Sequence, residues 1–539
     1  MSGEGQVEII ITSDRSMMSN HHGKEFLGFM TTGPAIGIPE RLWMWLAAPK
    51  LKVDRMGRPV EAPYGLRKVE AVLQNAGFNA AIIDPDHIHK HLDKLKVLMV
   101  GHHDFFAYGP PSNEWWMLVG KEPVNRVSFR RFMESPAVRE AKRRGVKIIA
   151  GGPAAWQWLW SLQEWRKWGV DCVIDGEAEL VVTDIVEKAL NGEPLPDYVY
   201  VGPGDSPPID KIPIIKGASV NGLVEIMRGC PRGCKFCSVT LRPLRFLPLE
   251  HIIKEIEVNV RAGVKNAILH SEDVLLYHAD GVKPRPEPLL KLHEAVMKAM
   301  PGSLSWAHAS LAAIKYAEDK YRLISKIMNE YVLPRQDLLG VEVGIETGSV
   351  RLAKIIMPAK SAPYPPEQWP DVVEDAFRIM HENKIIPAAT VILGLPEERP
   401  EDVVATLELL DRLKPYRSLI VPMFFVPMGA LKNRDWFRTH LLKEEHVEVL
   451  MKMLDHSLRW AEEIMNKFYM SEAMLAPVRM GIKLFLAFVR RNLHRIRPAL
   501  ESMVASKPEK AVVAAAGASV GSGCGCGMAS STGSNVGRG

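Results

Sequence analysis

Residues 227–240 have the sequence MRGCPRGCKFCSVT, which places Cys230, Cys234 and Cys237 in a C-x3-C-x2-C spacing. The glycine and proline residues between the cysteines favour a loop. Three thiolates on one short loop can converge on one face, as zinc or an iron–sulfur cluster requires. Structural zinc and electron-transfer clusters normally take four protein ligands, and no nearby Cys or His in the sequence supplies a fourth. The loop therefore predicts a metal centre with one position open to a group that is not protein.

This loop resembles the signature of the radical S-adenosylmethionine superfamily, including the aromatic Phe236 just before the last cysteine. The resemblance implies that the three cysteines hold a 4Fe–4S cluster whose fourth iron chelates S-adenosylmethionine. Other elements of that superfamily should then follow at the ends of strands.

Three later segments resemble those elements. NAILHSEDVLLY (266–277), LLGVEVGIETGS (338–349) and PAATVILGLPEE (387–398) each combine an apolar strand with polar or glycine residues at its end. The resemblance assigns the amino group, then the ribose and carboxylate, and then the adenine of S-adenosylmethionine to these strand ends: Ser271, Glu272 and Asp273; Glu346, Thr347 and Ser349; and Gly394.

The same region predicts alternating strands and helices. Residues 249–262 have the apolar spacing of an amphipathic helix, and SLIVPMFFVPMG (418–429) is a further strand. Helical stretches of about 10–15 residues separate the strands, which is typical of repeated β/α units. We expect a partial (β/α)6 barrel within residues 206–432, with its ligands at the carboxyl ends of the strands.

Residues 1–205 contain a second α/β pattern. VEIIIT (7–12), AAIID, KVLMVGHH, VKIIAGG and DCVIDGE are short apolar strands, too hydrophobic to be half-exposed and therefore buried between helices. They predict a doubly wound, Rossmann-like sheet whose crevice lies at the strand carboxyl ends. Glycines mark that edge of the sheet: Gly101, Gly151, Gly152 and Gly176.

KIIAGGPAAW (147–156) followed by DCVIDGEAEL (171–180) resembles the cobalamin-binding domain that precedes the radical barrel in a large subgroup of the superfamily. The motif D-x-H-x-x-G is missing, and His21 and His22 lie in the right loop at the wrong spacing. The resemblance therefore implies cobalamin without a histidine beneath the cobalt, its dimethylbenzimidazole tail lying in the sheet crevice. The expected contacts at this edge are His103, Asp104, Gly151, Gly152, Gly176 and Glu177. A capping role for His102, His103 and Asp104, and ordinary helix packing for the tryptophan-rich stretch 156–168, are the alternatives.

Composition narrows the setting of the 539-residue chain. Its net charge of +5 is too small to indicate a nucleic-acid groove or a polybasic membrane anchor. No apolar run approaches the roughly 18–20 residues of a membrane span, no signal peptide is evident, and six cysteines exclude a disulfide-stapled secreted protein. The sequence therefore predicts a cytoplasmic protein.

The C-terminal part falls into two segments. Residues 433–506 have helical patterning and a basic last stretch, FVRRNLHRIR (488–497), for which a solvated face and an acidic partner are both open. Residues 507–539 are mostly Ala, Gly and Ser, which predicts disorder. We expect Cys524 and Cys526 in this tail to be dispensable, because a flexible tail loses much entropy in organising ligands.

Together the resemblances imply a cobalamin-dependent (class B) radical S-adenosylmethionine methyltransferase that C-methylates an unactivated sp3 carbon. The cluster would cleave S-adenosylmethionine to a 5′-deoxyadenosyl radical, methylcobalamin would supply the methyl group, and a ferredoxin or flavodoxin would supply electrons. The preferred substrate is a protein side chain, as in archaeal enzymes that modify methyl-coenzyme M reductase, with a lipid or small molecule as the alternative.

Three other functions stay open. The first is a cobalamin-dependent rearrangement or cyclisation. The second is a methylthiotransferase acting on transfer RNA, a class with a second three-cysteine cluster in its N-terminal domain, where this chain has only Cys172. The third is a non-enzymatic cobalamin or iron–sulfur carrier.

Overall fold

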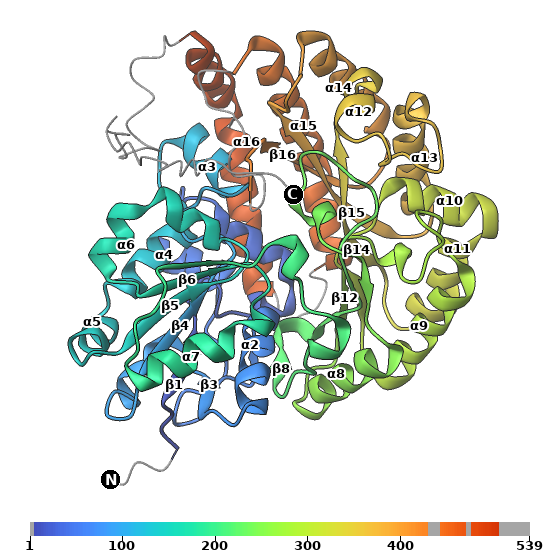
Figure 1. The fold of residues 1–539 in the computed structure, drawn as a ribbon. Coiled ribbons are helices and arrows are strands. Elements are labelled where there is room, and N and C mark those ends of the chain that lie inside the picture. Colours follow the sequence, from blue (N-terminus) through green and yellow to red (C-terminus); the bar gives the residue numbers. More distant parts are fainter. Residues whose placement is uncertain (1–4, 429–441, 470–475, 506–539) are drawn as a thin grey trace, which may run out of the picture.

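The computed structural model describes residues 5–428, 442–469 and 476–505. The N-terminal part forms a six-stranded parallel sheet in the order β3-β1-β4-β5-β6-β7 (Figure 1). Its strands are β1 (Ile9–Thr12), β3 (Ala80–Ile82), β4 (Val97–Gly101), β5 (Lys147–Gly151), β6 (Cys172–Asp175) and β7 (Tyr198–Tyr200). Because β1 lies between β3 and β4, the strand order reverses there, and the β1 and β4 loops flank the switch point at which open α/β sheets bind ligands.

Both faces of this sheet are buried, as the apolar strands predict. Alternate residues such as Ile11 and Met99 pack against α2 (Tyr64–Asn75) and α7 (Val182–Asn191). The residues between them, such as Leu98, pack towards α4 (Val124–Met133) and α5 (Pro136–Arg143). Successive side chains of each strand therefore point to opposite faces of the sheet, and both faces are packed in apolar layers.

The tryptophan-rich stretch belongs mainly to the second of these layers. Trp156 and Trp158, on η4 (Ala155–Trp160), are fully buried, and Trp158 makes edge contacts with Phe105 and Phe106. Edge-to-face aromatic packing of this kind stabilises a core. Ordinary packing therefore accounts for Trp158, whereas Trp156 also borders the cavity described below.

Six further parallel strands follow in chain order. They are β9 (Leu223–Glu225), β12 (Ala267–His270), β13 (Leu304–Trp306), β14 (Leu339–Glu346), β15 (Ile385–Leu393) and β16 (Leu419–Phe424). They form two sheets, β9-β12-β13 and β14-β15-β16, joined by a parallel bridge between His308 and Glu342. Helices cover their outer side: α8 (Leu249–Arg261), α9 (Pro286–Ala299), α10 (Leu311–Tyr321), α13 (Trp369–Glu382) and α14 (Pro400–Leu413) (Figure 1). This order agrees with the (β/α)6 arrangement expected from the sequence.

Two helices complete the described chain. α15 (Glu444–Glu463) packs on β16 and α14, and α16 (Ala476–Ala505) packs on α15 and on α1 (Glu40–Ala47) near the N-terminus. Within the described ranges, no helix combines the length and the apolar character needed to cross a bilayer. The tail with Cys524 and Cys526 lies outside the described residues, and the domain boundaries proposed from the sequence stay predictions.

Candidate active site between the sheet and the barrel

The cysteine loop lies between β10 (Met227–Arg228) and η9 (Ser238–Leu241). Gly229 has φ +84°, and a Cβ there would lie 2.6 Å from the carbonyl oxygen of Pro243, so the turn requires glycine. Cys237 N–H donates to the carbonyl of Cys234 at 3.2 Å, and Thr240 Oγ1 donates to the carbonyl of Cys237 at 3.0 Å. These local bonds hold the loop in one shape.

Arg232 anchors the loop to the barrel. Its Nη1 donates to the carbonyls of Lys360 (2.9 Å) and Ala362 (3.0 Å), and its Nη2 donates to Ser310 Oγ (2.6 Å). Asp273 lies 3.5 Å from the same guanidinium and also accepts from Ser310. Asp273, expected to contact S-adenosylmethionine, is thus buried and held by protein groups.

The three thiols are desolvated. Burial raises the pKa of Cys230 to about 12 and of Cys237 to about 11, and it also raises the pKa of Cys234. Iron stabilises the thiolate form, so metal binding offsets the cost of ionising these buried thiols. No described group of three or more His, Cys, Asp or Glu side chains is arranged around a single ion. Three cysteines without a fourth ligand instead fit a 4Fe–4S cluster, in which each thiolate binds a different iron.

A lysine that the sequence did not single out lies beside this loop. The Lys360 ammonium forms an ion pair with Glu346 and lies 5.6 Å from the centre of the Phe236 ring. The Glu346 carboxylate is buried and the Lys360 side chain is partly buried, and Thr390 Oγ1 donates to Glu346 at 3.1 Å. Lys360 also acts electrostatically on Cys234, where its charge favours the thiolate. Glu346 therefore lies beside the cysteine loop and is paired with Lys360, a residue that none of the sequence motifs indicated.

Ser349 and Gly394 have clear local roles. Ser349 caps α12 (Val350–Ile356) by accepting from Leu352 N–H at 3.1 Å, and its hydroxyl donates to Asp402. Gly394 has φ +73°, and its N–H donates to Glu398 at 3.1 Å. Their contacts with S-adenosylmethionine stay predictions.

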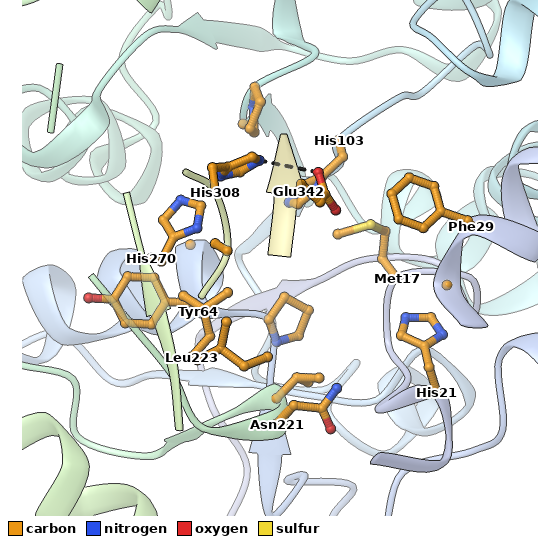
Figure 2. A pocket seen from close by; sticks show the side chains of 18 of the residues that line it. Met17, His21, Phe29, Tyr64, His103, Asn221, Leu223, His270, His308 and Glu342 are labelled. Carbon is orange, nitrogen blue, oxygen red and sulfur yellow. Dashed lines mark ion pairs between the residues drawn. The ribbon is translucent and has the colours of Figure 1, made fainter. Parts of the chain in front are cut away.

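One cavity of about 1570 Å³ is lined by both halves of the molecule (Figure 2). From the N-terminal sheet edge it receives Gly101, His103, Asp104, Gly151, Gly152, Gly176 and Glu177, and from the barrel Glu225, His270, Ser271, Glu272, His308 and Glu342. Eight residues predicted from two separate resemblances therefore meet at one cavity. The other predicted residues, including the three cysteines, are not among those that line it.

The cavity extends into an apolar slot between the N-terminal sheet and helices α2 and α7. Its walls are side chains of the strands and of both helices: Ile11, Met99, Ile149, Ile174, Leu66, Val69, Val72 and Val182. Gly101 stands at the strand end, where a Cβ would lie 2.7 Å from Leu66 Cδ2. A flat, weakly polar ring system such as the dimethylbenzimidazole tail of cobalamin fits such a slot.

The β1 and β4 loops meet at the switch point. His102 Nε2 lies 2.9 Å from Asp14 Oδ1, and both side chains are buried. Burial opposes ionisation of Asp14, but the contact with His102 outweighs it and lowers the pKa of Asp14. The neighbouring His103 faces the cavity, where desolvation and the nearby His102 and His270 lower its pKa to about 4. Asp104 accepts from Gln157, Gly109 and Asn125 and thus organises its own loop.

The barrel wall of the cavity carries polar groups without protein partners. Ser271 Oγ and Glu225 Oε2 are buried and accept or donate no hydrogen bond within the described structure. His308 Nδ1 lies 3.0 Å from the carbonyl of Ser271, and its Nε2 lies 3.3 Å from Glu342 (Figure 2). Burial opposes protonation of His308, but Glu342 outweighs it and raises the pKa of His308 to about 9. The wall thus offers a cationic imidazole and two buried oxygens to a ligand.

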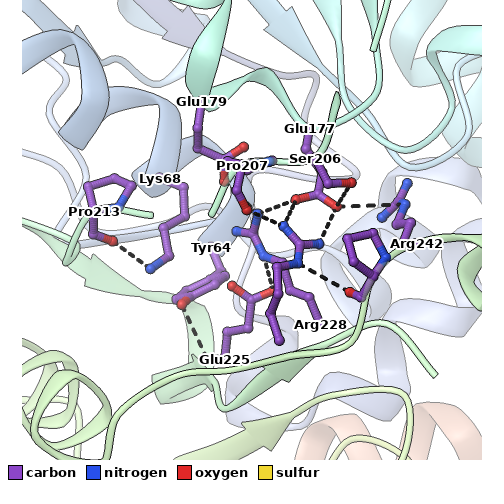
Figure 3. A network of polar contacts seen from close by, with 12 residues as sticks. Tyr64, Lys68, Glu177, Glu179, Ser206, Pro207, Pro213, Glu225, Arg228 and Arg242 are labelled. Atoms are coloured by element: carbon purple, nitrogen blue, oxygen red, sulfur yellow. Dashed lines mark hydrogen bonds and ion pairs between the residues drawn. The ribbon is translucent and has the colours of Figure 1, made fainter. Parts of the chain in front are cut away.

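Glu177 takes part in an ionic network that links the two halves (Figure 3). Its carboxylate accepts from Arg245 at 2.8 and 2.9 Å and from Arg228 at 2.8 Å, and Arg228 also contacts Glu225 and Glu179. Because Arg228 is two residues before Cys230, this network fixes the sheet edge relative to the cysteine loop. Glu177, expected to contact cobalamin, borders the cavity with its carboxylate already bound by arginines.

Residues 224–410 match the model of the Radical SAM superfamily, so this part of the chain is a radical S-adenosylmethionine domain. The match covers the cysteine loop and strands β12 to β15.

Among curated proteins, the chain is similar to tRNA-2-methylthio-N(6)-dimethylallyladenosine synthase of Orientia tsutsugamushi (strain Boryong), with 22% identity over 290 residues, 52% of this chain and 60% of that protein. It is also similar to the probable threonylcarbamoyladenosine tRNA methylthiotransferase of Archaeoglobus fulgidus, with 24% identity over 301 residues, 54% of this chain and 65% of that protein. The chain therefore spans less than two thirds of the length of these curated relatives.

Among solved structures, the fold is similar to the radical S-adenosylmethionine methyltransferase TsrM from Kitasatospora setae, which was solved with cobalamin and a 4Fe–4S cluster bound. The TM-score is 0.50 at 12% identity, over 79% of this chain and 77% of that one. At this identity the similarity concerns the fold, and it extends over both α/β parts of the chain.

Proposed function

We propose that the chain is a cobalamin-dependent radical S-adenosylmethionine methyltransferase. The observation that carries this proposal is the single cavity that joins the apolar slot of the N-terminal sheet to the barrel wall beside the cysteine loop. When bound, a 4Fe–4S cluster supplies the electron for reductive cleavage of S-adenosylmethionine, and cobalamin carries the methyl group.

The chain's own residues would bind, orient and enclose the reactants. Cys230, Cys234 and Cys237 would hold the cluster, and Arg232 fixes their loop against the barrel. Ser271 Oγ and Glu225 Oε2 would accept or donate hydrogen bonds to bound groups. His308 holds a proton at the cavity wall, and the residues from both halves would hold the reactants together in one cavity.

The proposed acceptor is an unactivated sp3 carbon, for which no general base is required. A protein side chain is one substrate that suits the cavity, because the N-terminal segment and α16 both contribute walls, including Leu27, Ile482 and Phe485. A lipid or a small molecule would reach the same walls. The identity of the methyl acceptor therefore belongs to the proposal.

The names of the curated relatives favour a second candidate, a methylthiotransferase acting on transfer RNA. That class needs a second three-cysteine cluster in its N-terminal domain, whereas the first 205 residues here contain only Cys172. Cys172 is the first residue of β6 and is buried, and burial raises the pKa of its thiol to about 12. The proposal of cobalamin chemistry is preferred for this reason.

The test uses a variant that fills the mouth of the slot. Gly65 borders the cavity in the first turn of α2, and a Cβ built there meets no atom within 4 Å. Gly65→Phe should lose bound cobalamin and the S-adenosylhomocysteine that accompanies cobalamin methylation, while it keeps its iron content. Gly204→Phe is the matched control, because Gly204 is equally open and does not border the cavity.

The products distinguish the alternatives after anaerobic reconstitution. Methyl transfer consumes two molecules of S-adenosylmethionine by different routes, so S-adenosylhomocysteine and 5′-deoxyadenosine should accumulate together. Formation of 5′-deoxyadenosine alone would indicate a rearrangement or cyclisation instead. Unchanged cobalamin binding by Gly65→Phe would show that the slot does not hold the cofactor.

A further inference from the structure

The first half of helix α16 is apolar on its outer face as well as its inner face. Its inner residues, such as Val478 and Phe485, pack on the protein. Its outer residues Met480 and Leu484 are 59% and 62% exposed, and Phe488, whose ring lies against Gly37, is 38% exposed. They recur every four residues and so share one side of the helix. A helix on the surface of a globular protein normally carries polar residues on that side.

The same outer face becomes basic further along. Arg491 and Arg495 follow Leu484 by seven and eleven residues, two and three turns on, and are exposed. Neither makes an ion pair with any described residue, whereas Arg490 and Arg497 bind Glu462 and Glu448 of α15. The helix contains six Lys and Arg residues and a single Glu. Arg491 and Arg495 therefore lie beyond the end of the apolar stripe, on the same side of the helix.

Helix α1 packs on the inner residues of α16 and also has apolar residues on its own exposed side. Trp43 contacts Phe485 with ring centres 5.2 Å apart, which joins the two helices. α1 exposes Leu42 and Trp45. Tryptophan is enriched where proteins meet the membrane–water interface, because its ring is apolar and its N–H is polar.

The apolar and basic residues on the outer face of α16 indicate what kind of partner binds there. A second copy of the chain would present the same apolar and basic face, and so would offer Arg491 and Arg495 no anionic surface to contact. Residues 506–539 contain no aromatic, Leu or Ile residue that could cover the apolar stripe. An anionic bilayer offers both acyl chains for the stripe and phosphates for the arginines.

We propose that α16 and α1 dock this face on the surface of an anionic lipid bilayer. The apolar stripe enters the boundary between headgroups and acyl chains, and Arg491 and Arg495 contact lipid phosphates. The inner face of α16 lines the cavity through Ile482 and Phe485, so docking brings the cavity next to the lipid. This inference does not depend on the proposed reaction.

The test is co-sedimentation of the full chain with vesicles. The chain should sediment with vesicles of phosphatidylcholine and phosphatidylglycerol, less so at high salt, and little with phosphatidylcholine alone. Arg491→Glu with Arg495→Glu should lower partitioning at least about 25-fold, since each basic residue near an anionic surface contributes about fivefold. Leu484→Glu with Phe488→Glu should lower it more than about tenfold.

Leu162→Glu is the matched control, because Leu162 on α6 (Leu162–Trp168) is 51% exposed and away from α16. It should partition like the unmodified chain, and circular dichroism should show that all variants are folded. Absence of vesicle binding, or equal binding by the α16 variants, would overturn the proposal. If the α16 variants instead convert a dimer to a monomer in sedimentation velocity without vesicles, the face binds a second copy and the proposal is wrong.

Discussion

The carboxylate of Glu177 and the guanidinium of Arg245 form a bidentate pair, with both N–H···O distances at 2.8–2.9 Å. Glu177 follows strand β6 of the N-terminal sheet, whereas Arg245 begins β11 (Arg245–Phe246), which pairs with the strand leading to the cysteines. Both side chains are buried. One carboxylate therefore connects the sheet edge to the segment that presents the predicted cluster ligands.

Glu177→Gln should lower the free energy of unfolding by about 3–5 kcal/mol, because it leaves the buried Arg245 without a counter-charge and removes one of the three carboxylates that contact Arg228. Denaturant unfolding measures this change. Glu250→Gln is the control, since Glu250 pairs with Lys254 on the exposed surface of α8 and its loss should leave the free energy of unfolding almost unchanged. Similar losses in both variants would show that the Glu177 network does not stabilise the fold.

Glu114→Gln should change how stability depends on pH. Burial raises the pKa of Glu114 from an ordinary 4.5 to about 8. The folded chain keeps a proton that the unfolded chain releases, so the stability that this proton provides falls as pH rises through about 4.5 to 8. Glutamine stays neutral and still offers an oxygen to the N–H of Phe424. The melting temperature of the variant should therefore fall less than that of the unmodified chain between about pH 5 and about pH 9; parallel curves would contradict this.

Glu342→Gln tests the charge of His308. The pKa of His308 is raised from 6.5 to about 9, so the protonated form adds stability that is complete below 6.5 and lost as pH rises through about 9. Without the carboxylate this contribution disappears. The variant should lose more melting temperature at about pH 6 than at about pH 10. In a His308→Gln background the same substitution should lose that pH dependence, and if it does not, another group is responsible.

The cysteine assignment predicts an all-or-none loss of iron. Replacing Cys230, Cys234 and Cys237 together by Ala should abolish the iron–sulfur absorbance and the formation of 5′-deoxyadenosine. A chain truncated near residue 507 should keep its iron, since we expect Cys524 and Cys526 to be dispensable. Iron retained by the triple variant, or lost on truncation, would mean that the tail cysteines are ligands.

The sequence predicted what a single contiguous segment determines. The cysteine loop is complete within eight residues, and β14 and β15 are long apolar strands whose period is evident. β13 was missed because it has three residues with Ser305 at its centre, too short for a periodic signal. Short strands of this kind depend on their neighbours for pairing.

The rest of the site arises from contacts between distant segments. Glu177 meets Arg228 and Arg245, which lie 51 and 68 residues further on, so no local spacing could indicate its network. Lys360 likewise pairs with Glu346, 14 residues earlier and on the other side of α12 in the sequence, and no motif marks this spacing. Ser349 was predicted as a ligand contact, yet its hydroxyl caps a helix, a role that serine at a helix start commonly has.

The two halves of the molecule are joined at a second buried point as well. Lys68 of α2 donates to the carbonyl of Pro213 at 2.6 Å (Figure 3). It also donates to Glu255 of α8 at 2.6 Å, and Tyr64 donates to the same Glu255. A body held at two separate points cannot swing about either one without breaking the other. The chain should therefore behave mechanically as one block: cleavage of the connecting segment 203–215 by a protease would leave two fragments that stay together until both ionic joints are dissolved.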